Sequence, residues 1–373
     1  MANDFNEKTA EISNFIKCKD CGANLKYLPG TPYLNCEYCG AKNEIEEEKE
    51  IEIVENDFES FLNEKEHLED KQTISTVKCT NCAASTTLQP NVTSSNCPYC
   101  DTPLVIKDAS TSSIIKPSYV LPFKIDRKKA TTEFVNWTKS LWFAPKKLKD
   151  YAEHSAEKLN GIYMPYWTYD AKTETHYKGL YGEYYYITET YTDSEGRTQT
   201  RQVQHINWFP TSGTVQNEFD DILVVSSKSL PENLANELEP WDLEALTKYN
   251  DKFISGFITE SYQLDLKSGF EKAKDKMQPV IKSSVLSNIG GDVQQITSLD
   301  SRYNDITFKH ILLPVWLSSY KYKDKVYRFL INARTGEVQG ERPYSIGRIV
   351  LLVLAIIIGI CAILFVIGVY TEK

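Results

Sequence analysis

The stretch from Ile349 to Val369, IVLLVLAIIIGICAILFVIGV, has 21 residues and contains no charged residue and no proline. A helix rises about 1.5 Å per residue, so this stretch reaches about 30 Å, the thickness of the hydrocarbon core of a bilayer. A buried helix of a soluble protein is the alternative, but such helices are rarely apolar on every face over this length. The sequence therefore predicts a transmembrane helix over residues 349–369.

The flanking charges predict how this helix is oriented. Arg342 and Arg348 precede the span, whereas one glutamate and one lysine follow it. Positively charged flanks stay in the cytoplasm, and the first residues, MANDFNEKTAEISNFIK, lack the apolar core of a secretory signal. We therefore expect a single-pass protein of the cell (cytoplasmic) membrane, with the N-terminal body in the cytoplasm. Ala355 and Gly359 form a small-xxx-small pair that fits a contact with another helix or a lipid-facing surface equally well.

Eight of the nine cysteines occur as four CxxC pairs, arranged in two modules. In each module fourteen residues separate the two pairs, so CxxC-x14-CxxC occurs twice and indicates an internal duplication. Two such pairs supply four thiolates in tetrahedral array with no open position, which is a structural zinc site. We expect two zinc ions, one per module, and no catalytic role for either. The predicted ligands are Cys18, Cys21, Cys36 and Cys39 in the first module and Cys79, Cys82, Cys97 and Cys100 in the second.

Each module has about thirty residues, too few for a stabilising hydrophobic core, so we expect metal binding to supply its folding energy. Gly22 and Gly40 follow the two pairs of the first module, where we expect the backbone to need a positive φ. The second module has Ala83 and Asp101 at these positions, which predicts looser turns.

Two other uses of the cysteines remain open from spacing alone. A CxxC pair can act in thiol–disulfide exchange, although four matched pairs favour a metal. Iron in place of zinc is compatible with four thiolates. Disulfides are not expected in a reducing cytoplasm, and Cys361, inside the span, is interpreted as a small apolar residue.

The charge distribution bears on partners. The chain has a net charge of −9 and a pI near 5.3, which argues against a general binder of nucleic acid or anionic lipid. Residues 16–43 carry about +2 and residues 76–108 carry no net charge, so neither module has the arginine-rich face that phosphate recognition requires. We therefore expect the modules to contact protein, and nucleic-acid binding is the less favoured alternative.

The chain divides by composition into five parts. An acidic run separates the two cysteine modules; its first half, Glu44 to Glu55, is interpreted as a solvated linker. Its second half predicts a short helix capped by Asn56 or Asp57. The run from Ala109 to Val120, with Lys116-Pro117, is interpreted as a linker as well. The expected parts are zinc ribbon 1 (14–43), an acidic linker (44–75), zinc ribbon 2 (76–108), an α+β body (114–343) and the transmembrane helix (349–369).

The body repeats one pattern, which predicts two related halves, about 114–218 and 219–343. In each, an aspartate caps a helix and a later apolar strand contains Pro-x-Trp. Proline inside an apolar strand predicts an edge or a bulge. The four positions are Asp126 with Pro165, and Asp265 with Pro314.

Local signals complete the prediction for the body. A basic helix is expected to open at Pro145 and to end at Gly161. Hairpin turns are expected at residues 193–196 and 332–336. The tyrosine-rich strands around the first turn are read as packed sheet faces, with a platform for a peptide or an added strand as the alternative.

No catalytic pattern is found. The five histidines are scattered, and the phosphate-binding patterns GxxxxGK[ST] and GxGxxG and the zinc-protease pattern HExxH are all absent. The sequence therefore predicts that the protein is not an enzyme.

The paired CxxC motifs, the segment KLNGIYMPYWTYDA and the apolar C-terminal stretch together resemble a bacterial family of double zinc-ribbon proteins (TFIIB-type zinc ribbon-like) with a C-terminal membrane span. The resemblance covers most of the chain, and GIYMPYW is its distinctive piece. It implies an association with PspA-type and flotillin-like (SPFH) membrane-stress proteins. Members also carry a primosomal helicase label, which this chain does not support because it has no nucleotide-binding loop.

Taken together, the sequence predicts two small β-knuckle zinc ribbons, an α+β domain with an internal duplication and one C-terminal transmembrane helix. The expected function is that of a non-enzymatic adaptor that binds partner proteins at the cytoplasmic membrane face, in a membrane-stress response. A membrane-tethered nucleic-acid-binding protein and a zinc or redox sensor are the two alternatives.

Overall fold

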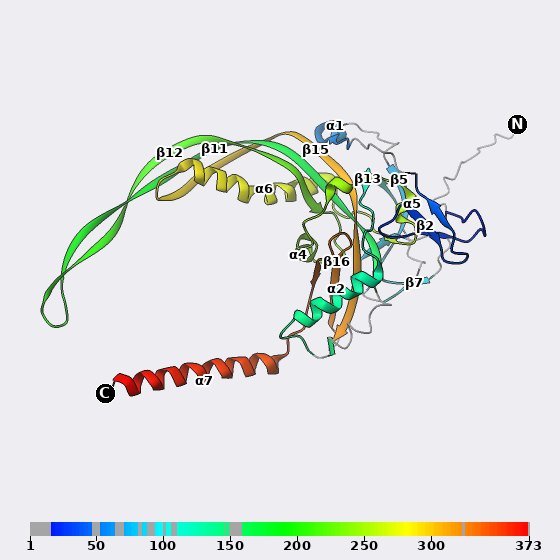
Figure 1. Ribbon diagram of the computed structural model, residues 1–373. Helices are drawn as coiled ribbons and strands as arrows, with labels where there is room; N and C mark the ends of the chain where they lie inside the picture. Colours follow the sequence, from blue (N-terminus) through cyan, green and yellow to red (C-terminus); the bar gives the residue numbers. More distant parts are fainter. Residues whose placement is uncertain are drawn as a thin grey trace.

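The computed structural model describes residues 16–46, 53–63, 71–80, 84–87, 94–99, 102–105, 110–145, 147–148, 159–322 and 325–371. Small sheets that bear the cysteines lie at one end of a larger sheet, and a long arm and the C-terminal helix project toward the other end (Figure 1). At this level the expected α+β class holds: a cysteine cluster near the N-terminus, a body built mostly of sheet and one apolar C-terminal helix.

The body is built on one nine-stranded sheet. Its strands are β4 (Asn56–Asp57), β10 (Tyr119–Val120), β11 (Asn160–Thr192), β12 (Thr198–Val225), β13 (Thr247–Lys248), β14 (Ile258–Thr259), β15 (Val293–Tyr322), β16 (Lys325–Asn332) and β17 (Val338–Gly340). The main path runs β12-β11-β15-β10-β13, while β14 pairs with β11, β4 and β16 pair with β15, and β17 pairs with β16. Both expected halves contribute to this sheet, and their expected boundary at residues 218 and 219 lies inside β12.

Pro165 and Pro314 lie in the two central strands, so the prediction of an edge or a bulge is wrong at both. β11 and β15 pair antiparallel across these positions. The carbonyl of each proline accepts a hydrogen bond of 3.1 Å, from the N–H of Ser226 and of Ala333 respectively. Ser226 and Ala333 lie just beyond the ends of β12 and β16. Each proline therefore lies where the neighbouring strand has ended, so the sheet requires no N–H donor from it on that side.

Two helices pack on this sheet, and both begin at the residues that the sequence predicts. α2 (Arg127–Ser140) follows Asp126, whose side chain accepts the N–H of Lys129, and α6 (Leu266–Ile289) follows Asp265, which accepts the N–H of Ser268. Residues three or four apart on α6 are buried and face the sheet, as an amphipathic helix requires. They are Phe270, Ala273, Met277, Ile281, Val285 and Ile289.

The remaining helices of the described body are short: α1 (Phe58–Asn63), α4 (Glu232–Asn236), α5 (Asp251–Ile254) and the 3-10 helix η3 (Leu243–Ala245). α1 confirms the predicted helix after the acidic run, with Asp57 accepting the N–H of Ser60 at 2.7 Å. Gly161 lies inside β11 and does not end a helix, which corrects that prediction; residues 149–158 lie outside the described residues.

The cysteine-bearing segments form three small sheets. The first module holds β1 (Leu25–Tyr27), β2 (Tyr33–Cys36) and β3 (Lys42–Glu44); the second holds β5 (Lys71–Lys78), β6 (Ser85–Thr87), β7 (Ser94–Asn96), β8 (Pro103–Val105) and β9 (Ser110–Ile115). β5 pairs with β9 from Lys71↔Ile115 to Thr76↔Ser110. Residues 71–75 and 110–115, predicted to be linker, are therefore strands that close the second module.

β11 and β12 form a hairpin whose far part extends beyond the rest of the sheet, and we call residues 183–208 the arm (Figure 1). β15 stops pairing with β11 at Gly182, so the arm has only two strands. The tyrosines nearer the body, such as Tyr163 and Tyr169, are fully buried. Those on the arm are not: its exposed large apolar residues are Tyr184, Tyr185, Tyr186, Ile187, Tyr191, Ile206 and Trp208.

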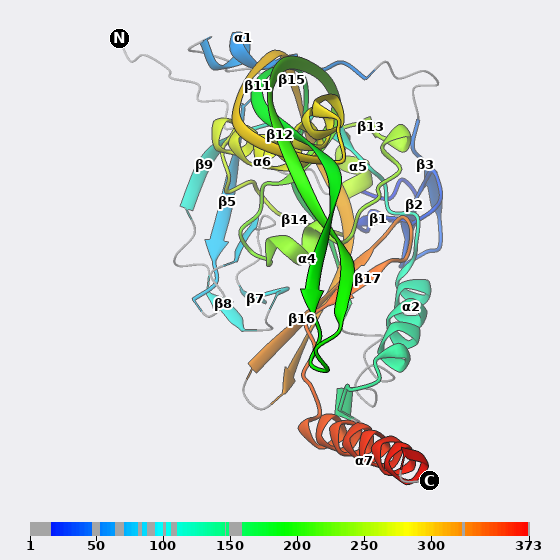
Figure 2. The same ribbon diagram turned by 90° about the vertical axis from the view of Figure 1, so that its left-hand side faces the viewer.

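α7 (Ile346–Thr371) leaves the body after β17 and extends away from it below α2 (Figure 2). Its segment Ile346–Leu364 has a mean hydropathy of 2.9, and none of it is buried against the rest of the chain. By length and composition it can cross a membrane, which agrees with the predicted span.

Candidate metal centre

The four cysteines of the first module converge on one point. All four sulfur atoms lie within 4.8 Å of one another, with 3.6 Å between Cys18 and Cys39 and 3.5 Å between Cys21 and Cys36. Four sulfurs held about 2.3 Å from a tetrahedral zinc ion would be about 3.8 Å apart. The cluster therefore has the donor set and the spacing to hold one metal ion with no open position.

A repeated backbone hydrogen bond shapes each CxxC turn. The N–H of the first cysteine donates to the carbonyl five residues later, from Cys18 to Ala23 at 2.8 Å and from Cys36 to Ala41 at 2.9 Å. Gly22 and Gly40 have φ of +74° and +76°, as predicted from their positions after the pairs. This geometry turns two sulfurs of each pair toward the same point.

The thiols influence one another strongly. The backbone N–H of Cys39 lowers the pKa of Cys36 to about 7. The N–H of Ala41 lowers the pKa of Cys39, but the neighbouring Cys21 thiol and burial outweigh it and raise that pKa to about 12. Four thiols this close resist ionising together unless they share a cation, and a bound metal would supply that charge.

The first module is packed onto the body and is not a separate bead on a linker. The N–H of Tyr27 donates to Ser255 O at 2.9 Å, and the N–H of Gly30 donates to Phe123 O at 2.8 Å. The buried thiols Cys18 and Cys36 belong to the same hydrophobic cluster as Phe123. Loss of a metal bound by these four cysteines would therefore disturb the body as well as the module.

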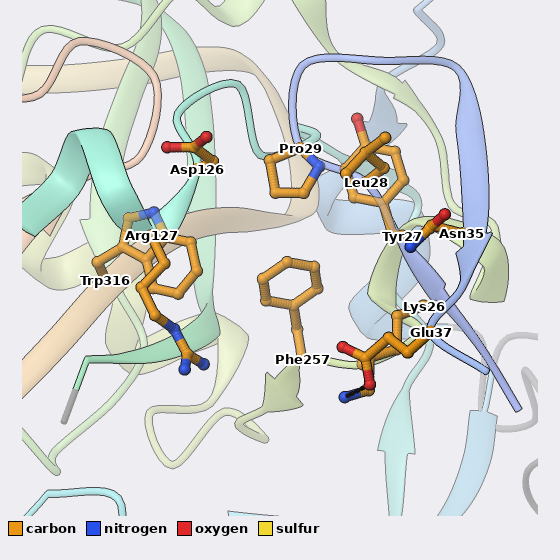
Figure 3. A pocket seen from close by; sticks show the side chains of 11 residues that line it. Lys26, Tyr27, Leu28, Pro29, Asn35, Glu37, Asp126, Arg127, Phe257 and Trp316 are labelled. Carbon is orange, nitrogen blue, oxygen red and sulfur yellow. Dashed lines mark ion pairs between the residues drawn. The ribbon is translucent and has the colours of Figure 1, made fainter. Parts of the chain in front are cut away.

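A cleft of about 290 Å³ lies where the first module meets the body (Figure 3). Phe257 and Trp316 form its aromatic wall, and the Arg127 guanidinium lies 5.8 Å from the centre of the Trp316 ring. The Lys26–Glu37 ion pair, 2.6 Å long, lines the opposite side. Aromatic walls with charges of both signs suit an amphipathic side chain of a partner.

The second module is described only in part. Cys79 and Cys97 are buried, whereas Cys82 and Cys100 lie outside the described residues. The same hydrogen bond recurs: Cys79 N donates to Ala84 O and Cys97 N to Thr102 O, both at 2.8 Å. The described residues thus repeat this hydrogen bond of the first module but do not assemble a second four-cysteine cluster, and Ala83 and Asp101, where looser turns are predicted, lie outside them.

Sequence reasoning missed a buried carboxylate that receives the second module. Glu260, 2% exposed, accepts a hydrogen bond of 2.6 Å from the phenol of Tyr99. It also accepts bonds from Ser227 at 2.8 Å and Gln263 at 3.0 Å, and a short one from Ser229. Tyr99 lies in the Cys-Pro-Tyr-Cys turn, so this network fixes that turn on the body.

A second missed group is Lys309, which is 2% exposed. Its ammonium pairs with Asp221 at 2.8 Å and, more closely, with Glu55. Glu55 belongs to the acidic run, and at the other end of that run Glu44 lies in β3 and Ile45 is buried, so the prediction that residues 44–55 are a solvated linker is wrong at both ends. A lysine inside the apolar run Phe308–Leu312 was the available signal, because such a charge needs a partner when buried.

The Lys309 ammonium is the counter-ion for several carboxylates. Burial raises the pKa of Asp170 to about 7, and its hydrogen bond with Glu55 adds to this. Burial also raises the pKa of Glu55, but hydrogen bonds from Asp170 and Lys309 outweigh it and hold that pKa at about 2. Asp170 is therefore the proton donor in this pair.

Two histidines have contrasting surroundings. His310 is 1% exposed; burial lowers its pKa to about 4, and its Nδ1 lies 3.0 Å from Ile115 O. It is a neutral core residue. His176 is exposed and lies beside Thr214.

The described residues thus define a mostly-sheet α+β protein with one four-cysteine cluster able to hold a metal ion and one helix able to cross a membrane. Among curated proteins, the chain is similar to the uncharacterized protein YdjG of Bacillus subtilis (strain 168), with 27% identity over 243 residues, 64% of this chain and 67% of YdjG. No protein-family model matches the chain, and no solved structure matches it.

Proposed function

We propose that this protein is a non-enzymatic adaptor, held in the cytoplasmic membrane by α7, whose body binds partner proteins on the cytoplasmic side. The single observation that carries the proposal is the arm. A two-stranded ribbon is marginally stable in water by itself, and clustered exposed aromatic side chains mark interaction sites. Such an element is expected to be more stable when a partner covers it than when it is surrounded by water.

The chemistry of the arm favours a protein partner. Trp208 is 42% exposed and Tyr186 is 60% exposed, and aromatic residues of this kind dominate protein interfaces. The arm carries four acidic and two basic residues, which disfavours the phosphate backbone of a nucleic acid. Both long edges of the arm beyond Gly182 offer backbone groups for an added strand.

The cysteine modules would hold this body in shape. We propose one zinc ion at Cys18, Cys21, Cys36 and Cys39, supported by the sulfur spacing. A second zinc ion in the second module is supported by the repeated N–H bonds at Cys79 and Cys97 and by the matched CxxC spacing. Both modules are then structural zinc ribbons.

The identity of the partners rests on the family resemblance. PspA-like and flotillin-like (SPFH) membrane proteins are the partners it implies, in a membrane-stress response. A zinc or redox sensor is the second candidate, because Cys21 and Cys39 are exposed and open to oxidants. It predicts reversible loss of zinc under mild oxidation, whereas a structural site resists it.

Capture of purified partners on membranes tests the adaptor. The full chain in membranes is mixed with a purified PspA-like or flotillin-like protein and captured after cross-linking. The variant Tyr186→Ser/Trp208→Ser should reduce capture by about tenfold, equivalent to about 1.4 kcal/mol of binding. Val280→Ser, an equally exposed apolar site on α6, should leave capture unchanged. A chain found in the soluble fraction, or one that captures only nucleic acid, would contradict the proposal.

A further inference from the structure

Trp142 is among the most exposed large apolar residues of the body, at 78%. It follows α2 and lies beside Phe143, with 6.1 Å between the ring centres. Tyr344, just before α7, is 55% exposed, and the Arg342 guanidinium lies 5.3 Å from the centre of its ring. We call Trp142, Phe143 and Tyr344 the collar.

Hydrogen bonds fix the collar to the first turn of α7. Nη1 of Arg348 donates to Trp142 O at 3.0 Å and to Ala144 O at 3.1 Å. The N–H of Ser345 donates to Phe143 O at 2.8 Å. Both views show the end of α2 close to the start of α7 (Figures 1 and 2). Trp142 cannot move far from the first turn of α7 without breaking these hydrogen bonds.

These bonds set the depth of Trp142 once α7 spans a bilayer. A guanidinium is costly in hydrocarbon, so Arg348 stays among water and headgroups. The Trp142 carbonyl is within hydrogen-bond distance of that guanidinium, so Trp142 lies at the same depth in the membrane as Arg348. Tryptophan and tyrosine favour this layer because their rings are apolar and their N–H and O–H groups are polar.

The charges around the collar are predominantly positive, with Glu341, directly before Arg342, as an acidic exception. Between residues 139 and 148, and between 342 and 348, the charged side chains that the structure describes are Lys139, Lys147, Arg342 and Arg348, all exposed. The whole chain carries −9, so this is a local reversal. Anionic phospholipid headgroups attract such a cluster.

We propose that the collar is a second membrane contact, seated in the phospholipid headgroup layer, which orients the body on the bilayer. It rests on the proposed anchoring by α7 and adds a contact in which Trp142 and Phe143 lie some two hundred residues away from α7 in the sequence. The ligand is anionic phospholipid.

Quenching by brominated lipid tests this contact. The full chain is reconstituted into vesicles of phosphatidylcholine and phosphatidylglycerol with bromine on the acyl chain near the headgroup, and tryptophan fluorescence is recorded. We expect clear quenching that falls by at least half in Trp142→Phe. Trp208→Phe, an exposed tryptophan of the arm, is the control and should keep it. Trp142 is exposed, so its replacement should not affect folding, which circular dichroism checks.

The outcomes separate the two proposals. Quenching in Trp142→Phe as strong as in the unchanged chain overturns the collar while leaving the anchor intact. A chain that does not float with the vesicles overturns the anchor and the collar together.

Discussion

The phenol of Tyr99 donates a hydrogen bond of 2.6 Å to Oε2 of Glu260, and both side chains are buried. Tyr99 precedes the last cysteine of the second module, and Tyr38 holds the same position in the first. Tyr38 is 85% exposed. Two modules with the same spacing therefore face the body differently: this turn is docked in the second and open to solvent in the first.

The docked turn predicts a difference between matched variants. Tyr99→Phe should lower the free energy of unfolding by about 1–3 kcal/mol, because Glu260 loses a donor inside the protein. Tyr38→Phe should leave stability unchanged because Tyr38 faces water. Urea denaturation measures both. Equal stability of the two variants would mean that the Tyr99–Glu260 bond does not hold the module.

Metal content should follow the modules. The full chain is expected to bind two zinc ions, and Cys18→Ser/Cys36→Ser should reduce this to one. Cys361→Ser, in the apolar helix, should still bind two. Mass spectrometry under native conditions or elemental analysis gives the count. One ion in the unchanged chain would restrict the metal to the described cluster, and iron in place of zinc would correct the metal.

The buried ion pair predicts a large loss from a single change. Lys309→Met leaves Glu55 and Asp221 without their cation, and breaking a buried pair costs about 3–5 kcal/mol. The control is Lys172→Met, since Lys172 pairs with Asp305 at 3.0 Å on the surface, where such pairs contribute little. Thermal or urea unfolding compares them, and similar losses would argue against a structural role of Lys309.

The proton on Asp170 predicts a pH dependence. Its pKa is about 7 in the folded chain against a reference of 3.8, so the folded state binds more protons than the unfolded state in this window. Its contribution to stability is complete below pH 3.8 and is lost as the pH rises to about 7. Asp170→Asn should flatten this decline. Glu55, with a pKa of about 2, acts in the opposite direction and only below about pH 4.5.

Urea midpoints measured at several pH values across this window test the assignment. An unchanged slope in Asp170→Asn would place the proton elsewhere in the cluster.

Local signals in the sequence predicted local structure well. Asp126 and Asp265 cap their helices, and Gly22 and Gly40 have the positive φ that their turns require, because each depends on neighbours within a few residues. Pro165 and Pro314 did not follow the rule for prolines in strands. Their positions depend on where neighbouring strands end, and those strands come from remote parts of the chain.

The residues of the candidate site were also predicted where they lie close together in the sequence and missed where they lie far apart. Cysteine spacing predicted the first cluster because four ligands lie within 22 residues. Spacing could not pair Glu260 with Tyr99, which are 161 residues apart. Nor could it separate the buried tyrosines of β11 from the exposed ones, because β15 and α6, which cover the strand only up to Gly182, come from remote parts of the chain.

The connection from β17 to α7 has only five residues, 341–345. The N–H groups at its two ends, on Glu341 and Ser345, bind Arg328 O and Phe143 O. With α7 in a bilayer, this short connection holds the body close to the membrane, so the body diffuses together with α7 in the plane of the bilayer. Proteins confined to the same surface would then be encountered by lateral diffusion at a high effective concentration. Dissolved proteins would have to come from the bulk.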